Sequence, residues 1–153
     1  MVTHRAEITA ASLSDRYRKT REQSVALIAD LQPEDTVVQT MPDVSPSKWH
    51  LAHITWFFER FVLEPNLTGY SRFDEQFHYL FNSYYYTAGK MHARAKRGLL
   101  SRPTLIEILD YRSYVDAAMQ QLMHIDADNE SVTNVITLGL NHEQQHQELL
   151  LAD

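Results

Sequence analysis

The sequence contains no cysteine and little glycine or proline, and each shortage excludes a class of protein. Without cysteine in its 153 residues, the chain has neither a disulfide framework nor a cysteine-ligated zinc site. Its 4 glycines and 5 prolines, with no low-complexity tract, argue against a disordered chain and favour a mostly helical one. This length is enough for one domain with a buried hydrophobic core.

Long apolar segments and an excess of positive charge are also missing. No stretch approaches the roughly 20 apolar residues of a membrane-spanning helix. The first ten residues, MVTHRAEITA, lack the apolar segment of a secretory signal. The net charge of −6 disfavours nucleic acid as a main partner. We therefore expect a cytoplasmic protein that acts on neither nucleic acid nor membranes.

Four segments have the apolar period of an amphipathic helix, so the sequence predicts an all-α fold, a four-helix bundle. Their ends carry capping signals: Ser45 as an N-cap before Pro46, and a capping box between Thr104 and Glu107. A connection of about forty residues, 66–103, joins the second helix to the third; loops of this length are usually functional. The four segments are approximately residues 12–30, 45–64, 104–122 and 131–153.

The fourth segment contains the strongest local signal, the run NHEQQHQE at 141–148. His142 and His146 are four residues apart, so both rings lie on one helix face and can reach one metal ion at about 2.0–2.1 Å. This face continues an apolar stripe and points into the bundle. A single histidine there is usually a hydrogen-bonded core residue, but two neighbouring imidazoles both need partners, and a metal supplies both.

A third ligand must then come from a facing helix. Glu143 and Glu148 point away from the two histidines, by roughly 100° and 200° around the helix from their nearest histidine, which excludes them. The second segment offers His50 and His53 in Trp-His-Leu-Ala-His, and spacing alone does not choose between them. Gln145, on the face of His142, is a candidate to hydrogen-bond a metal-bound histidine or to contact the substrate.

The same run literally matches the zinc-protease pattern H-E-x-x-H, in which the glutamate is the general base. That pattern is short and arises often by chance. The sequence also shows no sign of the sheet that lines a protease cleft. We therefore favour a metal-binding helical bundle over a protease.

Four stretches resemble the N-terminal DinB-like domain of the sulfoxide synthases of ergothioneine biosynthesis, also called hercynine oxygenases. The stretches are SPSKWHLAHITWFFE at 45–59, FNSYYY at 81–86, HARAKRGLLSRPT at 92–104 and NHEQQHQELLLAD at 141–153. The resemblance implies a non-haem iron(II) held by His53, His142 and His146. It also implies an O₂-dependent joining of a thiol, cysteine or γ-glutamylcysteine, to hercynine. From donor chemistry alone, Zn²⁺ or Ni²⁺ would suit three imidazoles as well.

The resemblance gives roles to further residues of the long connection. Arg94 and Arg97 match family positions that clamp the carboxylates of the thiol substrate, and a planar guanidinium binds a carboxylate bidentately. Tyr84 and Tyr85 are expected to line the same pocket.

Family members continue into a second domain, so we expect residues 1–153 to be a single DinB-like domain at the N-terminal part of a longer two-domain enzyme, incomplete without its C-terminal domain. A smaller departure is Ala93, where relatives usually have proline. Two other functions stay open: a stand-alone DinB-like metal-dependent thiol transferase, and a non-catalytic helical interaction module.

Overall fold

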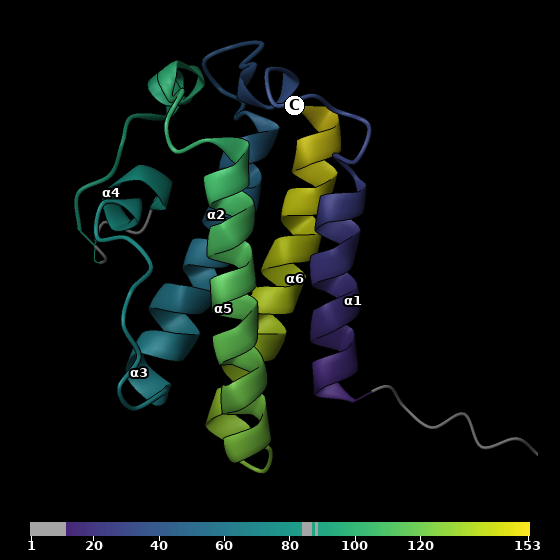
Figure 1. Ribbon diagram of the computed structural model, residues 1–153, viewed down its shortest axis with the longest axis vertical. Helices are drawn as coiled ribbons and strands as arrows, with labels where there is room; N and C mark the ends of the chain where they lie inside the picture. The colour runs from purple at the N-terminus through teal and green to yellow at the C-terminus, as the bar shows by residue number, and fades with distance from the viewer. Residues whose placement is uncertain (1–11, 84–86, 88) are drawn as a thin grey trace, which may run out of the picture.

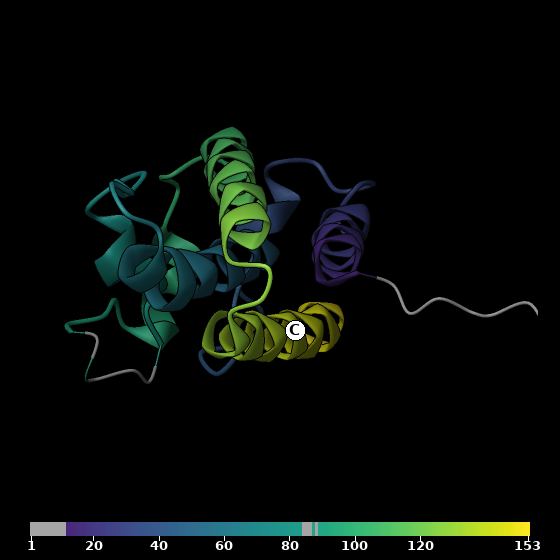
Figure 2. The ribbon, with the colours of Figure 1, turned by 90° about the horizontal axis from the view of Figure 1, so that it is seen from below.

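The computed structural model describes residues 12–83, 87 and 89–153, and over these residues the chain forms helices and loops without β-strands. Four long helices make a bundle, as the apolar period predicts (Figure 1). α1 and α6 run in one direction and α2 and α5 in the other, and the end-on view shows the four helices around a common centre (Figure 2). The long helices are α1 (Leu13–Ala26), α2 (Ser47–Phe58), α5 (Leu105–Ile125) and α6 (Glu130–Ala152).

The central helix is α2, in which every residue from Lys48 onward is buried. A helix that is apolar nearly all round must be covered on every side, and α2 packs against both α5 and α6. It continues without a break through the π-helical turn η2 (Glu59–Leu63) into the short α3 (Glu64–Asn66). The predicted N-cap is wrong by one residue: Pro46 occupies the cap, and the Ser45 hydroxyl instead accepts a hydrogen bond from Arg97.

The other helix ends follow their local sequence. Thr104 and Glu107 form the predicted capping box at the start of α5, each satisfying a free amide of the other. Asn129 caps α6 by accepting from the Val132 amide. α1 begins after the Ser12 cap but ends at Ala26, earlier than predicted. The residues that follow form turns with hydrogen bonds between residues three apart, rather than α-helix.

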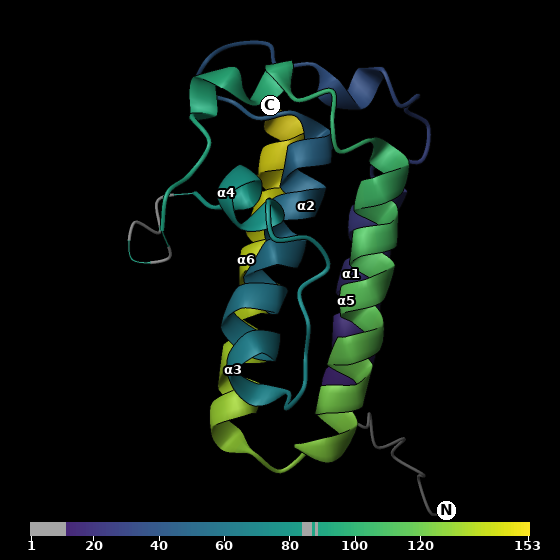
Figure 3. The ribbon, with the colours of Figure 1, turned by 60° about the vertical axis from the view of Figure 1, so that its left-hand side comes forward.

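The long connection contains helical turns of its own. α4 (Phe77–Phe81) packs on α2, where the Trp49 indole N–H donates to the Leu80 carbonyl at 3.1 Å. The 3-10 turn η4 (Arg94–Leu99) and the turn η1 (Asp35–Val37) lie at the end of the bundle where the C-terminus also lies (Figure 3). The connection therefore covers one side of α2 and one end of the bundle.

A close approach of α6 to α2 depends on Gly139. A Cβ at this position would lie 2.5 Å from Cε1 of Phe58 and 3.1 Å from Cε1 of Phe57. With any larger residue, either the Phe58 ring or the two helices would have to shift. The largest fully buried side chains of the described core are Tyr17, Leu51, Ile54, Trp56, Phe58, Leu63, Ile108, Tyr111, Met119, Leu122, Ile136 and Leu140.

A buried ionic network joins α1, α5 and α6. Glu143 is fully buried and its carboxylate accepts from Arg21 at 3.0 Å, from Arg112 at 3.2 Å and from the Ser24 hydroxyl at 2.6 Å. Burial alone would raise the pKa of Glu143, but the two guanidinium groups outweigh it and hold that pKa below its usual value. Asp116 binds the other edge of Arg21 at 2.7 Å. The two carboxylates, Glu143 and Asp116, therefore balance the two guanidinium groups.

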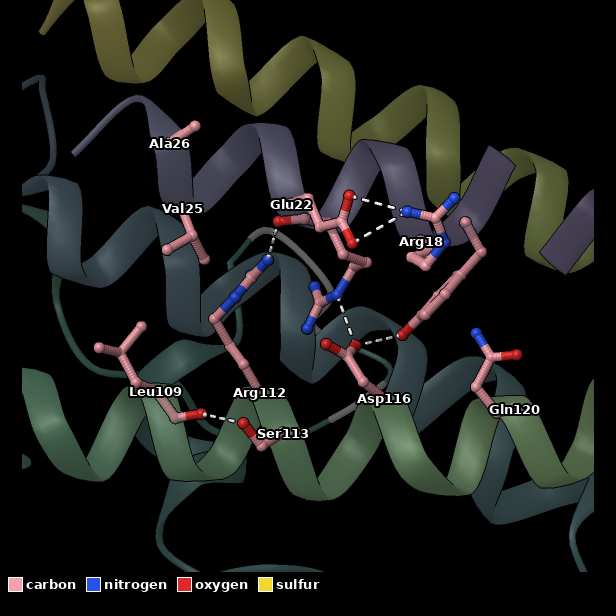
Figure 4. A pocket seen from close by; sticks show the side chains of 11 residues that line it. Arg18, Glu22, Val25, Ala26, Leu109, Arg112, Ser113, Asp116 and Gln120 are labelled. Carbon is pink, nitrogen blue, oxygen red and sulfur yellow. Dashed lines mark hydrogen bonds and ion pairs between the residues drawn. The ribbon is translucent and has the colours of Figure 1, made fainter. Parts of the chain in front are cut away.

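A cavity of about 560 Å³ opens between α1 and α5 beside this network (Figure 4). Arg112 and Asp116 reach its wall from α5, while Val25 and Ala26 give α1 an apolar side. Its lining includes no histidine. Among the described helices, none is long and apolar enough to cross a membrane.

Candidate metal centre

Three histidines converge between the beginning of α2 and the end of α6. His53 stands in the second turn of α2, and His142 and His146 face it from α6. The Nε2 atoms of His53 and His142 are 3.2 Å apart, and one ring nitrogen from each of the three histidines lies within 4.8 Å of the others. The ring centroids of the three pairs are separated by 4.5, 4.7 and 5.0 Å. The rings that the sequence placed on one helix face therefore meet a third ring from another helix.

These distances fit a shared transition-metal ion. Two nitrogens bound to one metal at about 2.0–2.1 Å, with an angle between about 95° and 110°, lie roughly 3.0–3.4 Å apart. The separation of 3.2 Å between His53 and His142 is in that range. Nδ1 of His142, the ring nitrogen that does not take part in this contact, is buried and has no hydrogen-bond partner among the described residues.

Burial keeps all three imidazoles neutral, which metal binding requires. Burial lowers the pKa of His142 to about 4. Burial first, and then the neighbouring His142, His50 and Arg97, lower the pKa of His146 to about 2. The pKa of His53 lies well below its usual value for the same first reason, with His146 and His142 adding to it. The lone pairs are therefore available without a proton having to leave.

His53 is oriented before any ligand arrives. Its Nδ1 lies 2.6 Å from the Phe81 carbonyl, which can only accept, so Nδ1 carries the hydrogen and Nε2 keeps the lone pair. The rings of Trp49 and Trp56, one helical turn before and after, stack on it with centroid distances of 4.6 and 5.6 Å. A carbonyl partner behind a ligating imidazole is the usual arrangement in metal sites.

His50, the other candidate from α2, stands beside the cluster but uses both nitrogens elsewhere. Its Nδ1 faces Nδ1 of His146 at 2.9 Å and its Nε2 faces the Asp153 carboxylate at 2.8 Å. Its side chain is buried. His50 is not among the histidines whose ring nitrogens lie within 4.8 Å of one another, whereas His53 is, which separates two candidates that spacing left equal.

The three histidines form part of the wall of a cavity of about 320 Å³. Arg97 is buried there, with its guanidinium 3.4 Å from the centroid of the Trp49 ring and its terminal nitrogens donating to the hydroxyls of Ser45 and Ser83. Arg94 is partly buried on the same wall and donates to the Asp43 carbonyl at 3.3 Å. The cavity is thus a polar pocket with fixed positive charge near the neutral histidines.

The sequence also predicts substrate contacts by Gln145, Tyr84 and Tyr85. Gln145 lines this cavity, and its side chain is exposed. Tyr84 and Tyr85 lie outside the described residues, so their predicted place in the pocket stays a prediction.

The position of Glu143 argues against the protease pattern. A general base must face the water held by the metal, but this carboxylate accepts from Arg21, Arg112 and Ser24. A base held by two guanidinium groups also loses the basicity that the reaction needs. Glu143 is therefore a structural residue.

Among the polar residues that line this pocket, sequence reasoning missed Asp43, Ser45, Ser83 and Asp153. Asp153 could have been found, because it lies seven residues after His146 and so on the same helix face. The two serines lie in loops, where no periodicity indicates which way a side chain points.

Comparison with known proteins identifies the family. The model of the DinB superfamily matches residues 16–150, which span all four long helices almost completely. The comparison with curated proteins gave no match.

Proposed function

We propose that this chain, which belongs to the DinB superfamily, binds one transition-metal ion through His53, His142 and His146 and uses it to process a thiol substrate. More specifically, we propose that the chain is the iron-binding domain of a sulfoxide synthase that joins a cysteine-type thiol to hercynine with O₂. The convergence of three neutral imidazoles at the wall of one polar cavity is the observation that carries the metal site.

The sulfoxide-synthase proposal is supported by the positions of the four stretches that carry the resemblance. The cavity is lined by residues from all four: the stretch at 45–59, Ser83 from 81–86, the two arginines from 92–104, and the end of α6. Segments that far apart in sequence meet at one place, as expected if the resemblance reflects a shared site rather than a shared scaffold. The chemistry of a site, not its fold, is what indicates a reaction.

The protein groups suit an anionic, thiol-bearing substrate. A bound metal ion would favour the thiolate over the thiol. Arg97 places a fixed positive charge beside the histidines, because Trp49, Ser45 and Ser83 hold its guanidinium in one position. Arg94 lies on the same wall and adds a second positive charge. These charges attract a substrate carboxylate and orient its thiol toward the histidines.

The first experiment measures bound metal. The chain is loaded anaerobically with Fe²⁺, Zn²⁺ or Ni²⁺ in turn and desalted, and metal content is determined by elemental analysis. We expect about one equivalent of iron in the wild type and most of it lost in His53→Ala, His142→Ala and His146→Ala. The control is His124→Ala, which removes an exposed histidine at the end of α5. Circular dichroism checks that each variant remains folded.

The second experiment tests the reaction class. Cysteine or γ-glutamylcysteine should change the visible spectrum of the iron-loaded protein, and this change should need millimolar rather than micromolar thiol in Arg97→Ala. The readout is this spectral change of the iron-loaded protein, rather than turnover with hercynine and O₂. Zinc retention with thiol transfer would overturn the iron proposal and favour the stand-alone transferase. Absence of any bound metal would overturn the metal site itself and favour a helical interaction module.

A further inference from the structure

We propose that Asp153 and His50 form a hydrogen-bonded chain that fixes the tautomer of His146 and so presents its Nε2 to the metal. This inference rests on the proposed metal site and assigns a positioning role to two residues outside the three-histidine set. These hydrogen bonds lead from Asp153 at the end of α6 to His50 on α2 and back to His146 on α6.

The direction of the hydrogen bonds follows from Asp153. Its Oδ2 accepts from the Ser45 amide at 3.0 Å and lies 2.8 Å from Nε2 of His50. An ionised carboxylate only accepts, so Nε2 of His50 carries the hydrogen that fills this contact. The His50 side chain is buried, and an imidazole removed from water is held in its neutral form, with one hydrogen only. Its Nδ1 must then be an acceptor.

The contact between His50 and His146 then fixes which nitrogen of His146 carries the hydrogen. Nδ1 of His50 and Nδ1 of His146 are 2.9 Å apart, and two lone pairs at that distance would repel. Since Nδ1 of His50 accepts, Nδ1 of His146 donates, and the lone pair of His146 stays on Nε2. Without this chain a neutral imidazole can also place its hydrogen on Nε2, which would block metal binding by that atom.

The same constraint appears independently at His53, where the Phe81 carbonyl holds the hydrogen on Nδ1. Two of the three proposed ligands are thus set to bind through Nε2, one by a backbone carbonyl and one by a carboxylate acting through a second imidazole. A carboxylate behind a ligating imidazole also makes it a stronger ligand, and loss of such a partner typically costs about 10–100-fold in metal affinity.

The experiment has one readout without metal and one with it. Long-range ¹H–¹⁵N NMR of the metal-free 153-residue chain reads the tautomer of each histidine. We expect His146 as the Nδ1–H form in the wild type and a shift toward the Nε2–H form in His50→Phe and Asp153→Ala. Chelator competition with Zn²⁺ should show about 10–100-fold weaker binding in the same two variants.

A conservative variant separates positioning from simple packing. The side-chain oxygen of His50→Asn can accept from Nδ1 of His146, so this variant should keep the Nδ1–H tautomer and most of the Zn²⁺ affinity, whereas His50→Phe keeps volume and loses both. An Nε2–H form of His146 in the wild type, or His50→Phe binding zinc as tightly as the wild type, would overturn the inference. A wild type that binds no zinc, nickel or iron would instead overturn the proposed function.

Discussion

At the scale of single residues, hydrogen bonds fix which ring nitrogen carries the hydrogen in two of the three histidines. His53 and His146 each have an acceptor behind Nδ1, and burial keeps both rings neutral. His142 differs, because its buried Nδ1 has no partner within the described chain. Of the three proposed ligands, it is the one whose orientation is not fixed by a hydrogen bond behind the ring. We therefore regard it as the most adaptable of the three.

The neighbouring Glu143 has an opposite, structural role, which a substitution tests. Glu143→Gln keeps the shape of the side chain but leaves Arg21 and Arg112 without their shared negative charge in a buried place. Breaking a buried ion pair from one side costs about 3–5 kcal/mol. We expect the free energy of unfolding in urea to fall by about 3 kcal/mol or more, while the folded protein still binds metal.

Glu148→Gln on the same helix is the matched control, because Glu148 is exposed. It should change stability by less than about 0.5 kcal/mol. If Glu143→Gln were as stable as this control, the ionic network would not hold α6 in place. If it abolished metal binding in a fully folded protein, Glu143 would belong to the site after all.

At the scale of helices, the separation of α2 and α6 decides whether the histidines can meet. Gly139 lies one turn before His142, where the Phe58 ring occupies the space that a side chain would need. Gly139→Ala should lower the free energy of unfolding by about 1 kcal/mol. Overpacking costs about 1–3 kcal/mol and exceeds the gain in helix propensity of about 1 kcal/mol.

Leu138→Ala is the comparison for this substitution, since Leu138 is 59% exposed on the same helix. We expect it to stay within about 0.5 kcal/mol of the wild type in the same urea titration. A stabilised Gly139→Ala variant would mean that the two helices do not approach as closely as the structure shows.

The helices themselves could be predicted from the sequence, because apolar period and caps are local signals. The capping box at Thr104 and the one-face placement of His142 and His146 are examples. The start of α2 was misplaced because Ser45, a good cap by type, is held by Arg97 from a distant loop. Tertiary contacts of this kind have no signal within a short window of sequence.

At the scale of the whole molecule, the site is made by the crossing of segments remote in sequence. The connection between α2 and α5 returns over the end of the bundle and brings Arg94 and Arg97 to the cavity that α2 and α6 line. The sequence could indicate that both arginines belong together, but not that Arg97 would stack on Trp49. The choice between His50 and His53 likewise needed three-dimensional contacts, because both lie on a helix that is buried on all sides.

The central claim is that one ion joins α2 to α6 through three imidazoles. X-ray absorption spectroscopy of the metal-loaded protein tests it most directly. We predict three imidazole nitrogens at about 2.0–2.2 Å from the metal in the wild type. In the small fraction of metal that His53→Ala retains, we predict two imidazole nitrogens, with oxygen from solvent in the vacant position. A spectrum dominated by carboxylate or water oxygen, or one unchanged by His53→Ala, would contradict the account.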